Sequence, residues 1–198
     1  VILHFVQNDT MGVIIAILFI ILVTILLAII LGFFFFVIDT FLDLPYVATK
    51  REKVATIIKL AGIKPKETVV DLGSGDGRLL FAAAAVGARA IGYEVNPYLA
   101  ILTHLKYQFL KRNIIRSYKK TFIRPVTVYR QNLWQADLKT ADVIFVYGRG
   151  KTMKRFEDFV YQNAKKGTRI IVNSDLTKPF PNKRPIKSEN GIYLYEAS

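Results

Sequence analysis

A glycine-rich turn flanked by acidic residues is the part of this sequence best suited to bind a ligand. In "VVDLGSGDGRLL", residues 69–80, three glycines alternate with other residues behind Asp71, which stands near the end of an apolar run. Glycine adopts backbone conformations that other residues avoid and lets a ligand approach the main chain. A second acidic residue, Glu94, follows 17 residues after Gly77. This order predicts a nucleotide-like ligand whose ribose hydroxyls meet the second acid.

Three classes of nucleotide site compete for this turn. The dinucleotide fingerprint G-x-G-x-x-G places its third glycine where this chain has Arg78. The phosphate-binding P-loop needs a Gly-Lys-Ser/Thr ending, which the sequence lacks. The D-x-G-x-G-x-G loop of Rossmann-like methyltransferases that bind S-adenosylmethionine matches at Asp71, Gly73, Gly75 and Gly77.

S-adenosylmethionine carries no phosphates, so the loop has a different task from that of a P-loop. It must bring backbone close to the methionine part, while acidic side chains suit the ammonium group and the ribose. The predicted cofactor-binding residues here are Asp71, Gly73, Ser74, Gly75, Asp76, Gly77, Glu94 and Asn96. The alternative is a turn without a ligand; the order of acid, loop, helix, strand and second acid favours the cofactor.

Two later residues are weaker candidates for the same site. Asn132 follows the third predicted strand, where an amide or acid of this fold usually meets adenine; the alternative is a plain turn-forming residue. Tyr147 ends the fourth predicted strand, which faces the transferable methyl group, so it is the candidate catalytic residue; the alternative is a packing tyrosine. With no cysteine and two histidines, the sequence predicts no metal site.

Strands and helices alternate around these residues. The predicted strands are 68–73, 89–95, 125–131, 141–148, 168–175 and 191–197. The predicted helices are 51–63, 77–87, 96–120 and 151–167, and 177–191 is expected to be a proline-rich loop. This alternation predicts an α/β fold with a mostly parallel sheet.

An uncharged apolar run, residues 11–38, precedes this domain. As a helix its 28 residues measure about 42 Å, more than the roughly 30 Å of bilayer hydrocarbon. The run is too long and too bulky at its end for a signal peptide, and it lacks the polar stripe of a soluble helix. No lysine or arginine precedes it, whereas Lys50, Arg51 and Lys53 follow. We therefore predict a single transmembrane helix with the C-terminal domain in the cytoplasm.

The domain is strongly basic. Asp9 is the only charged side chain in residues 1–38, so the remainder carries a net charge of +14, against +13 for the whole chain. Residues 106–130 hold eight lysines and arginines and no acid, which fits either a solvated surface or a membrane-facing patch. Anchoring at a membrane argues against nucleic acid as a partner. The expected organisation is a tail, 1–10; a transmembrane helix, 11–38; a linker, 39–50; and the domain, 51–198.

Several segments resemble one family more closely than methyltransferases in general. They are "PYV" at 45–47, "VVDLGSGDGRL" at 69–79, "GYEVNPYL" at 92–99, "NLWQADLKTADVIFVYG" at 132–148 and "GIYLYE" at 191–196. This pattern resembles the small single-span protein-lysine methyltransferases that modify the ATP synthase c subunit and the adenine nucleotide translocase, and their prokaryotic relatives. The resemblance covers residues 30–198 and includes a hydrophobic N-terminal segment.

The resemblance implies a class I methyltransferase fold, S-adenosyl-L-methionine as cofactor and a lysine side chain as methyl acceptor. It also implies that Tyr46 and Thr49 lie over the cofactor. The expected partners are the bilayer and a membrane-protein substrate. Two alternatives stay open: a lipid or quinone acceptor at the membrane, and a non-catalytic module that binds the cofactor without turnover.

Overall fold

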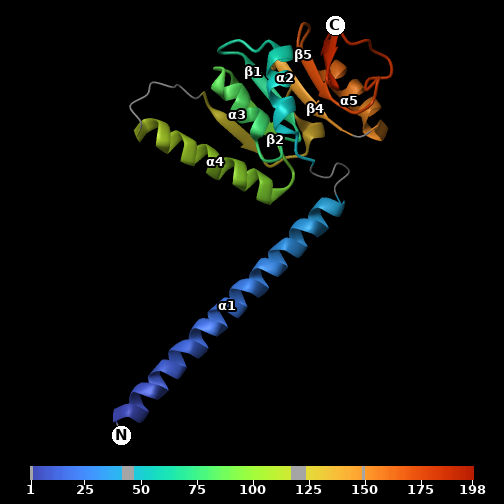
Figure 1. Ribbon diagram of the computed structural model, residues 1–198. Helices are drawn as coiled ribbons and strands as arrows, with labels where there is room; N and C mark the ends of the chain where they lie inside the picture. The colour runs from blue at the N-terminus through green and yellow to red at the C-terminus, as the bar shows by residue number, and fades with distance from the viewer. Residues whose placement is uncertain (1, 42–46, 117–123, 149) are drawn as a thin grey trace. The chain divides into compact units, whose positions relative to one another are not determined.

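The computed structural model describes residues 2–41, 47–116, 124–148 and 150–198 (Figure 1). The chain divides into two compact units, Val1–Pro45 and Tyr46–Ser198, and each is considered by itself. The domain start expected at residue 51 lies a few residues inside the second unit.

The first unit is one long helix, α1 (Ile2–Phe41). Its segment Met11–Phe34 has 24 residues and a mean hydropathy of 3.6, and none of its most apolar stretch is buried. The polar Thr24 hydroxyl donates to the Ile20 carbonyl at 2.7 Å, so its hydrogen bond is made within the helix. By length and composition this helix suffices to cross a bilayer.

The second unit is built on a seven-stranded sheet in the order β3-β2-β1-β4-β5-β7-β6 (Figure 1). The strands are β1 (Thr68–Leu72), β2 (Arg89–Tyr93), β3 (Val126–Tyr129), β4 (Val143–Tyr147), β5 (Arg169–Asn173), β6 (Lys187–Glu189) and β7 (Ile192–Glu196). The first five are parallel, and β7 runs antiparallel between β5 and β6. The chain order reverses between β1 and β4, the point where ligands of open α/β sheets bind.

Among the described residues, helix α2 precedes the first strand, and three helices and one short turn of helix connect later strands. They are α2 (Arg51–Ala61), α3 (Arg78–Ala85), α4 (Pro97–Arg116), η1 (Leu133–Gln135) and α5 (Gly150–Asn163). Helix α2 ends as its sequence predicts: Gly62 has a φ of 53° and donates its N–H to the Lys59 carbonyl. A left-handed residue at this position favours glycine.

The structure confirms the mostly parallel α/β fold and corrects three details. Helix α5 ends at Asn163 rather than residue 167, because the chain turns at 164–167 to enter β5. The proline-rich segment contains β6, which pairs with β7 in a short hairpin. The 3-10 turn η1 was not predicted. The last residues of the predicted helix 96–120 lie outside the described residues.

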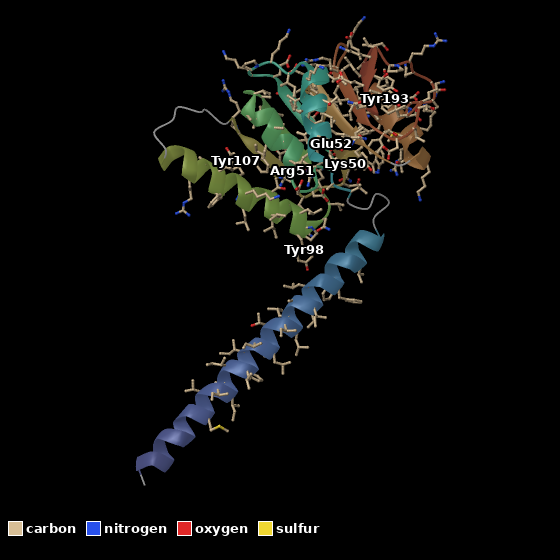
Figure 2. The ribbon with its side chains drawn as sticks, in the orientation of Figure 1. Lys50, Arg51, Glu52, Tyr98, Tyr107 and Tyr193 are labelled. Carbon is tan, nitrogen blue, oxygen red and sulfur yellow. The ribbon has the colours of Figure 1, made fainter. Side chains whose placement is uncertain are left out.

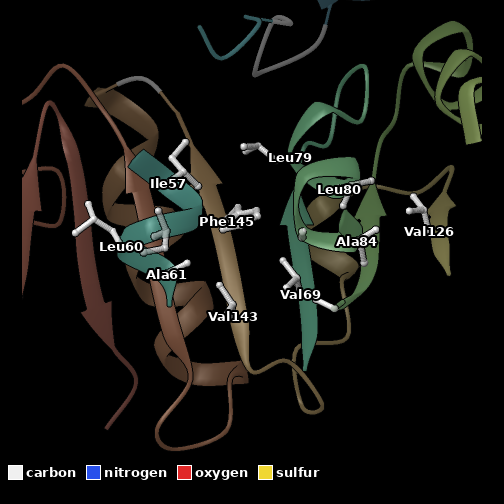
Figure 3. Packing of buried hydrophobic residues seen from close by; sticks show 14 of the residues in the cluster. Ile57, Leu60, Ala61, Val69, Leu79, Leu80, Ala84, Val126, Val143 and Phe145 are labelled. Atoms are coloured by element: carbon white, nitrogen blue, oxygen red, sulfur yellow. The ribbon is translucent and has the colours of Figure 1, made fainter. Parts of the chain in front are cut away.

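A continuous apolar core lies between the sheet and the helices α2 and α3. Figure 3 shows Ile57 and Ala61 of α2 and Leu80 of α3 on the same face of the sheet, close to Phe145 of β4. The alanines of α3 let this helix approach the strands, and two of them, at 83 and 84, are fully buried. Close packing at this position fixes the loop that joins β1 to α3.

Gly92, the residue before the last in β2, is required by this close packing. A Cβ atom there would lie 2.5 Å from the Ser74 Oγ and 2.6 Å from the Leu80 Cδ1. We expect Gly92→Ala to lower the free energy of unfolding by about 1–3 kcal/mol through overpacking, measured by urea denaturation. A Ser74→Gly/Gly92→Ala double variant should recover part of this loss. A single variant as stable as the parent would contradict the argument.

Candidate functional site

The candidate site lies where β1, β2 and β4 end at the same edge of the sheet. The segment 73–77 leaves β1 there and leads into α3. Its three glycines have left-handed φ values of 90°, 54° and 78° in chain order. At Gly77 a Cβ atom would also lie 2.4 Å from the Thr103 Cγ2, so both conformation and space require glycine.

Backbone hydrogen bonds tie this glycine loop, residues 73–77, to the end of β2. The N–H groups of Gly73 and Ser74 both donate to the Tyr93 carbonyl at 3.0 Å. Within the loop, the Gly77 N–H donates to the Ser74 carbonyl at 2.9 Å. The Thr103 hydroxyl of α4 donates to the Gly75 carbonyl at 3.2 Å. The loop is therefore held from two sides.

Glu94 organises the same region from the end of β2. One carboxylate oxygen accepts the Gly75 N–H at 2.7 Å, and the other accepts the Asn96 N–H at 2.8 Å. The side chain is buried. Glu94 thus connects the loop after β1 with the start of α4, directly at the predicted ribose position.

Asp71 is a buried carboxyl group beside two other acids. Burial, together with the negative charges of Glu94 and Asp76, raises the pKa of Asp71 to about 7. A cation placed beside Asp71 would favour its ionised form. The site thus fits a positively charged ligand such as the ammonium group of an amino acid cofactor.

Asp76 is held by cations of the protein itself. Its carboxylate accepts from the Arg78 Nε and Nη2, both at 2.9 Å, and lies 3.5 Å from the Lys106 Nζ. Burial acts to raise the pKa of Asp76, but Arg78 and Lys106 outweigh it and hold that pKa below its ordinary value. Arg78 Nη1 also donates to the Thr49 carbonyl. This network brings buried Thr49 to the loop, while Tyr46 lies outside the described residues.

Two further predicted residues have buried polar atoms at the loop. The Asn96 side chain accepts the Tyr98 N–H at 3.0 Å and so caps α4, but its Nδ2 has no hydrogen-bond partner among the described residues. The Ser74 Oγ also has none and packs against Gly92. Buried polar atoms without partners are uncommon, and a ligand can satisfy them. Ser74 turns its side chain to β2, and its backbone N–H and carbonyl bond to Tyr93 and Gly77.

The remaining two candidates lie on neighbouring segments. The exposed Asn132 accepts the Trp134 N–H at 3.1 Å, so it caps η1 as a turn-forming residue does. Trp134 in turn packs on Phe156 of α5, with ring centroids 4.7 Å apart, which positions this segment. Tyr147 ends β4 in register with Asn173 of β5.

The network also includes residues that the sequence did not reveal. Arg78, Lys106 and Thr103 all contribute hydrogen bonds at the glycine loop. The short spacing between Asp76 and Arg78 could have suggested their ion pair. Thr103 and Lys106 lie on α4, and only the structure shows which side of this helix faces the glycine loop.

Solved structures with a similar fold identify the class of this domain. An RNA methyltransferase from Salinibacter ruber, in complex with S-adenosyl-L-homocysteine, matches with a TM-score of 0.62 and 22% identity, over 76% of this chain and 92% of that one. A methyltransferase from Thiobacillus denitrificans, also bound to S-adenosyl-L-homocysteine, matches with a TM-score of 0.50 and 18% identity, over 62% and 48%. The second unit therefore has the Rossmann-like methyltransferase fold.

Sequence comparison gives the family. The model of the ANTKMT methyltransferase domain matches residues 71–176, more than half of the chain, and the chain belongs to this family. Mouse adenine nucleotide translocase lysine N-methyltransferase is 29% identical over 73% of this chain and 58% of its own length. A protein-lysine N-methyltransferase of Saccharolobus islandicus is 23% identical over 77% and 92%. The chain spans about three fifths of the length of the first curated relatives.

Proposed function

We propose that this chain is a membrane-anchored S-adenosylmethionine-dependent methyltransferase that modifies a lysine side chain of a membrane protein. The observation that carries the proposal is the glycine loop beside buried Asp71 and Glu94, in a chain whose family includes the translocase lysine methyltransferase. The human lysine N-methyltransferase of the ATP synthase c subunit, 26% identical over 78% of this chain and 62% of its own, supports a lysine acceptor as well.

Each part of the site has a proposed role toward the cofactor. The backbone of 73–77 lies against the methionine part, and Asp71 balances its positive charge. Glu94 accepts the ribose hydroxyls, and Asn96 supplies its Nδ2. Asn132 contacts the adenine, while Tyr46 and Thr49 cover the cofactor. Asp76 holds Arg78 and thereby the segment that contains Thr49.

The chemistry requires a neutral acceptor amine. When bound, S-adenosylmethionine supplies a methyl group already activated by a sulfonium. A lysine with a reference pKa of about 10.4 needs about 4.6 kcal/mol to become neutral at pH 7. Lys53 donates to Asn173 at the end of β5 and lies 3.5 Å from the exposed Asp175. The part of its positive charge that this ion pair does not offset disfavours protonation of the acceptor. We assign to Tyr147 the task of orienting the amine for in-line attack.

The membrane anchor of this proposal is α1. Its apolar segment Met11–Phe34 is long enough for a span. Lys50, Arg51 and Lys53 follow it, and this basic flank favours a cytoplasmic domain. A membrane-bound enzyme reaches a membrane-protein substrate without leaving the bilayer.

Membranes from cells that express the full chain, incubated with tritiated S-adenosylmethionine, test the proposal. We expect a labelled protein band that disappears with Glu94→Ala. Glu189→Ala, on the edge strand β6, should leave the label unchanged and serves as the matched control. Amino-acid analysis of the labelled band should give methyl-lysine.

Other outcomes would point elsewhere. Label in the organic extract instead of a protein would replace the lysine acceptor by a lipid or quinone. Tight cofactor binding without label in either fraction would favour a non-catalytic binding module.

A further inference from the structure

The outward face of α4 carries a row of apolar side chains. Ile101, Leu105 and Phe109, spaced four residues apart on one side of the helix, are 58%, 59% and 66% exposed. Leu102 beside them is also exposed. Figure 2 shows Tyr98 pointing away from the domain, and Tyr107, on another side of the helix, packs against the core. We call Ile101, Leu102, Leu105 and Phe109 the α4 stripe.

The α4 stripe has no role in holding the helix on the domain. The opposite side of α4 provides that attachment through Leu99, which is buried, and Thr103, which bonds the glycine loop. A helix on the surface of a soluble domain usually presents polar residues to solvent. A row of exposed large apolar side chains instead marks a surface for a membrane or a partner.

The charge around the α4 stripe indicates which of these covers it. Lys111 and Arg112 are exposed beside the stripe, and residues 106–130 carry eight basic residues without an acid. Basic residues that flank an apolar helical face are typical of helices that lie in the headgroup region of anionic membranes. We propose that the α4 stripe inserts into the surface of an anionic lipid bilayer.

The consequence concerns the position of the site. Helix α4 begins at Pro97, three residues after Glu94, so the stripe starts beside the edge where the strands end. Thr103 and Lys106 connect the same helix to the glycine loop. Insertion of the α4 stripe would bring the site to the level of the headgroups. This deepens the proposed function, on which it rests, because it selects acceptor lysines close to the membrane surface.

The absence of cysteine from the sequence permits a direct test. Leu105→Cys and Phe109→Cys, labelled with an environment-sensitive nitrobenzoxadiazole dye, are reconstituted as full chains into vesicles of phosphatidylcholine and phosphatidylserine. We expect a blue-shifted emission that doxyl-labelled lipids quench strongly. The matched control is Gln162→Cys on the exposed side of α5, whose dye should remain in water and unquenched. Quenching should weaken in vesicles of phosphatidylcholine alone.

Three results would overturn the inference. One is an unshifted emission at positions 105 and 109, which would mean that the dye remains in water. Another is a blue shift without quenching by doxyl lipids, which would mean that protein, such as a second copy of the chain, covers the stripe. The third is equal quenching without phosphatidylserine. Quenching of the dye does not depend on methyl transfer, so the two experiments can fail separately. Methyl transfer without quenching would reject only the insertion of the α4 stripe. Quenching without methyl transfer would reject only the proposed function.

Discussion

Replacement of Asp71 by asparagine is expected to weaken S-adenosylmethionine binding about 10- to 100-fold, the range for losing a hydrogen bond to a charged group. The same change should not lower the stability of the cofactor-free protein. Asp71 is buried beside Glu94 and Asp76, and its pKa is raised to about 7. Asparagine keeps the shape of the side chain and removes a charge that the empty site disfavours. Isothermal titration calorimetry and thermal unfolding measure the two effects.

The pH dependence provides the control for this argument. Because the folded pKa of Asp71 lies above its ordinary value of 3.8, its contribution to stability is present at low pH and lost as the pH rises through about 7. The asparagine of the Asp71→Asn variant cannot titrate, so the stability of the variant relative to the parent should rise between pH 3.8 and about 7 and stay constant above that. Binding of the cationic cofactor favours the ionised carboxylate, so parent affinity should fall below pH 7. Parent affinity that is constant from pH 6 to 8 would contradict the assignment.

The succession of strands along the chain and the position of the glycine loop could be predicted from local sequence. Apolar runs that end near Asp71 and at Tyr147 mark strands, and Gly62 marks a helix end, because these signals depend on a few adjacent residues. The predicted candidates Glu94 and Asn96 also meet the loop, since parallel strands end at one edge.

The remaining features depend on contacts between distant segments. In the sequence, Gly92 is an ordinary strand residue, and only the structure shows that Ser74 packs against it. The sequence predicts that Asp76 binds the ligand, and the structure shows its carboxylate in ion pairs with Arg78 and Lys106. The hairpin β6–β7 contains a strand of three residues, too short for a periodic pattern. In each case the sequence around the residue is too short or too ambiguous to reveal the partner that decides its role.

Replacement of Glu94 by alanine is expected to reduce cofactor affinity at least about 100-fold, because a charged hydrogen-bonding group is lost and the loop it holds is released. The Gly75 and Asn96 N–H groups, at 2.7 and 2.8 Å from the carboxylate, would both lose their acceptor. Each such loss costs about 1–3 kcal/mol when the group stays buried, so the melting temperature should fall as well. Calorimetric titration and thermal unfolding of the purified full chain test both effects.

Glu94→Gln separates the charge of this residue from its shape. The glutamine oxygen can accept one of the two N–H groups, so the loss of stability should be smaller than in Glu94→Ala. Because the charge of Glu94 contributes to the raised pKa of Asp71, its removal should move the pH at which Asp71 titrates below about 7. In the cofactor-free variant, the loss of stability with rising pH should then end at a lower pH than in the parent and be smaller in total. An unchanged pH dependence would mean that the charge of Glu94 does not raise the pKa of Asp71, and that the two acids act independently at this site.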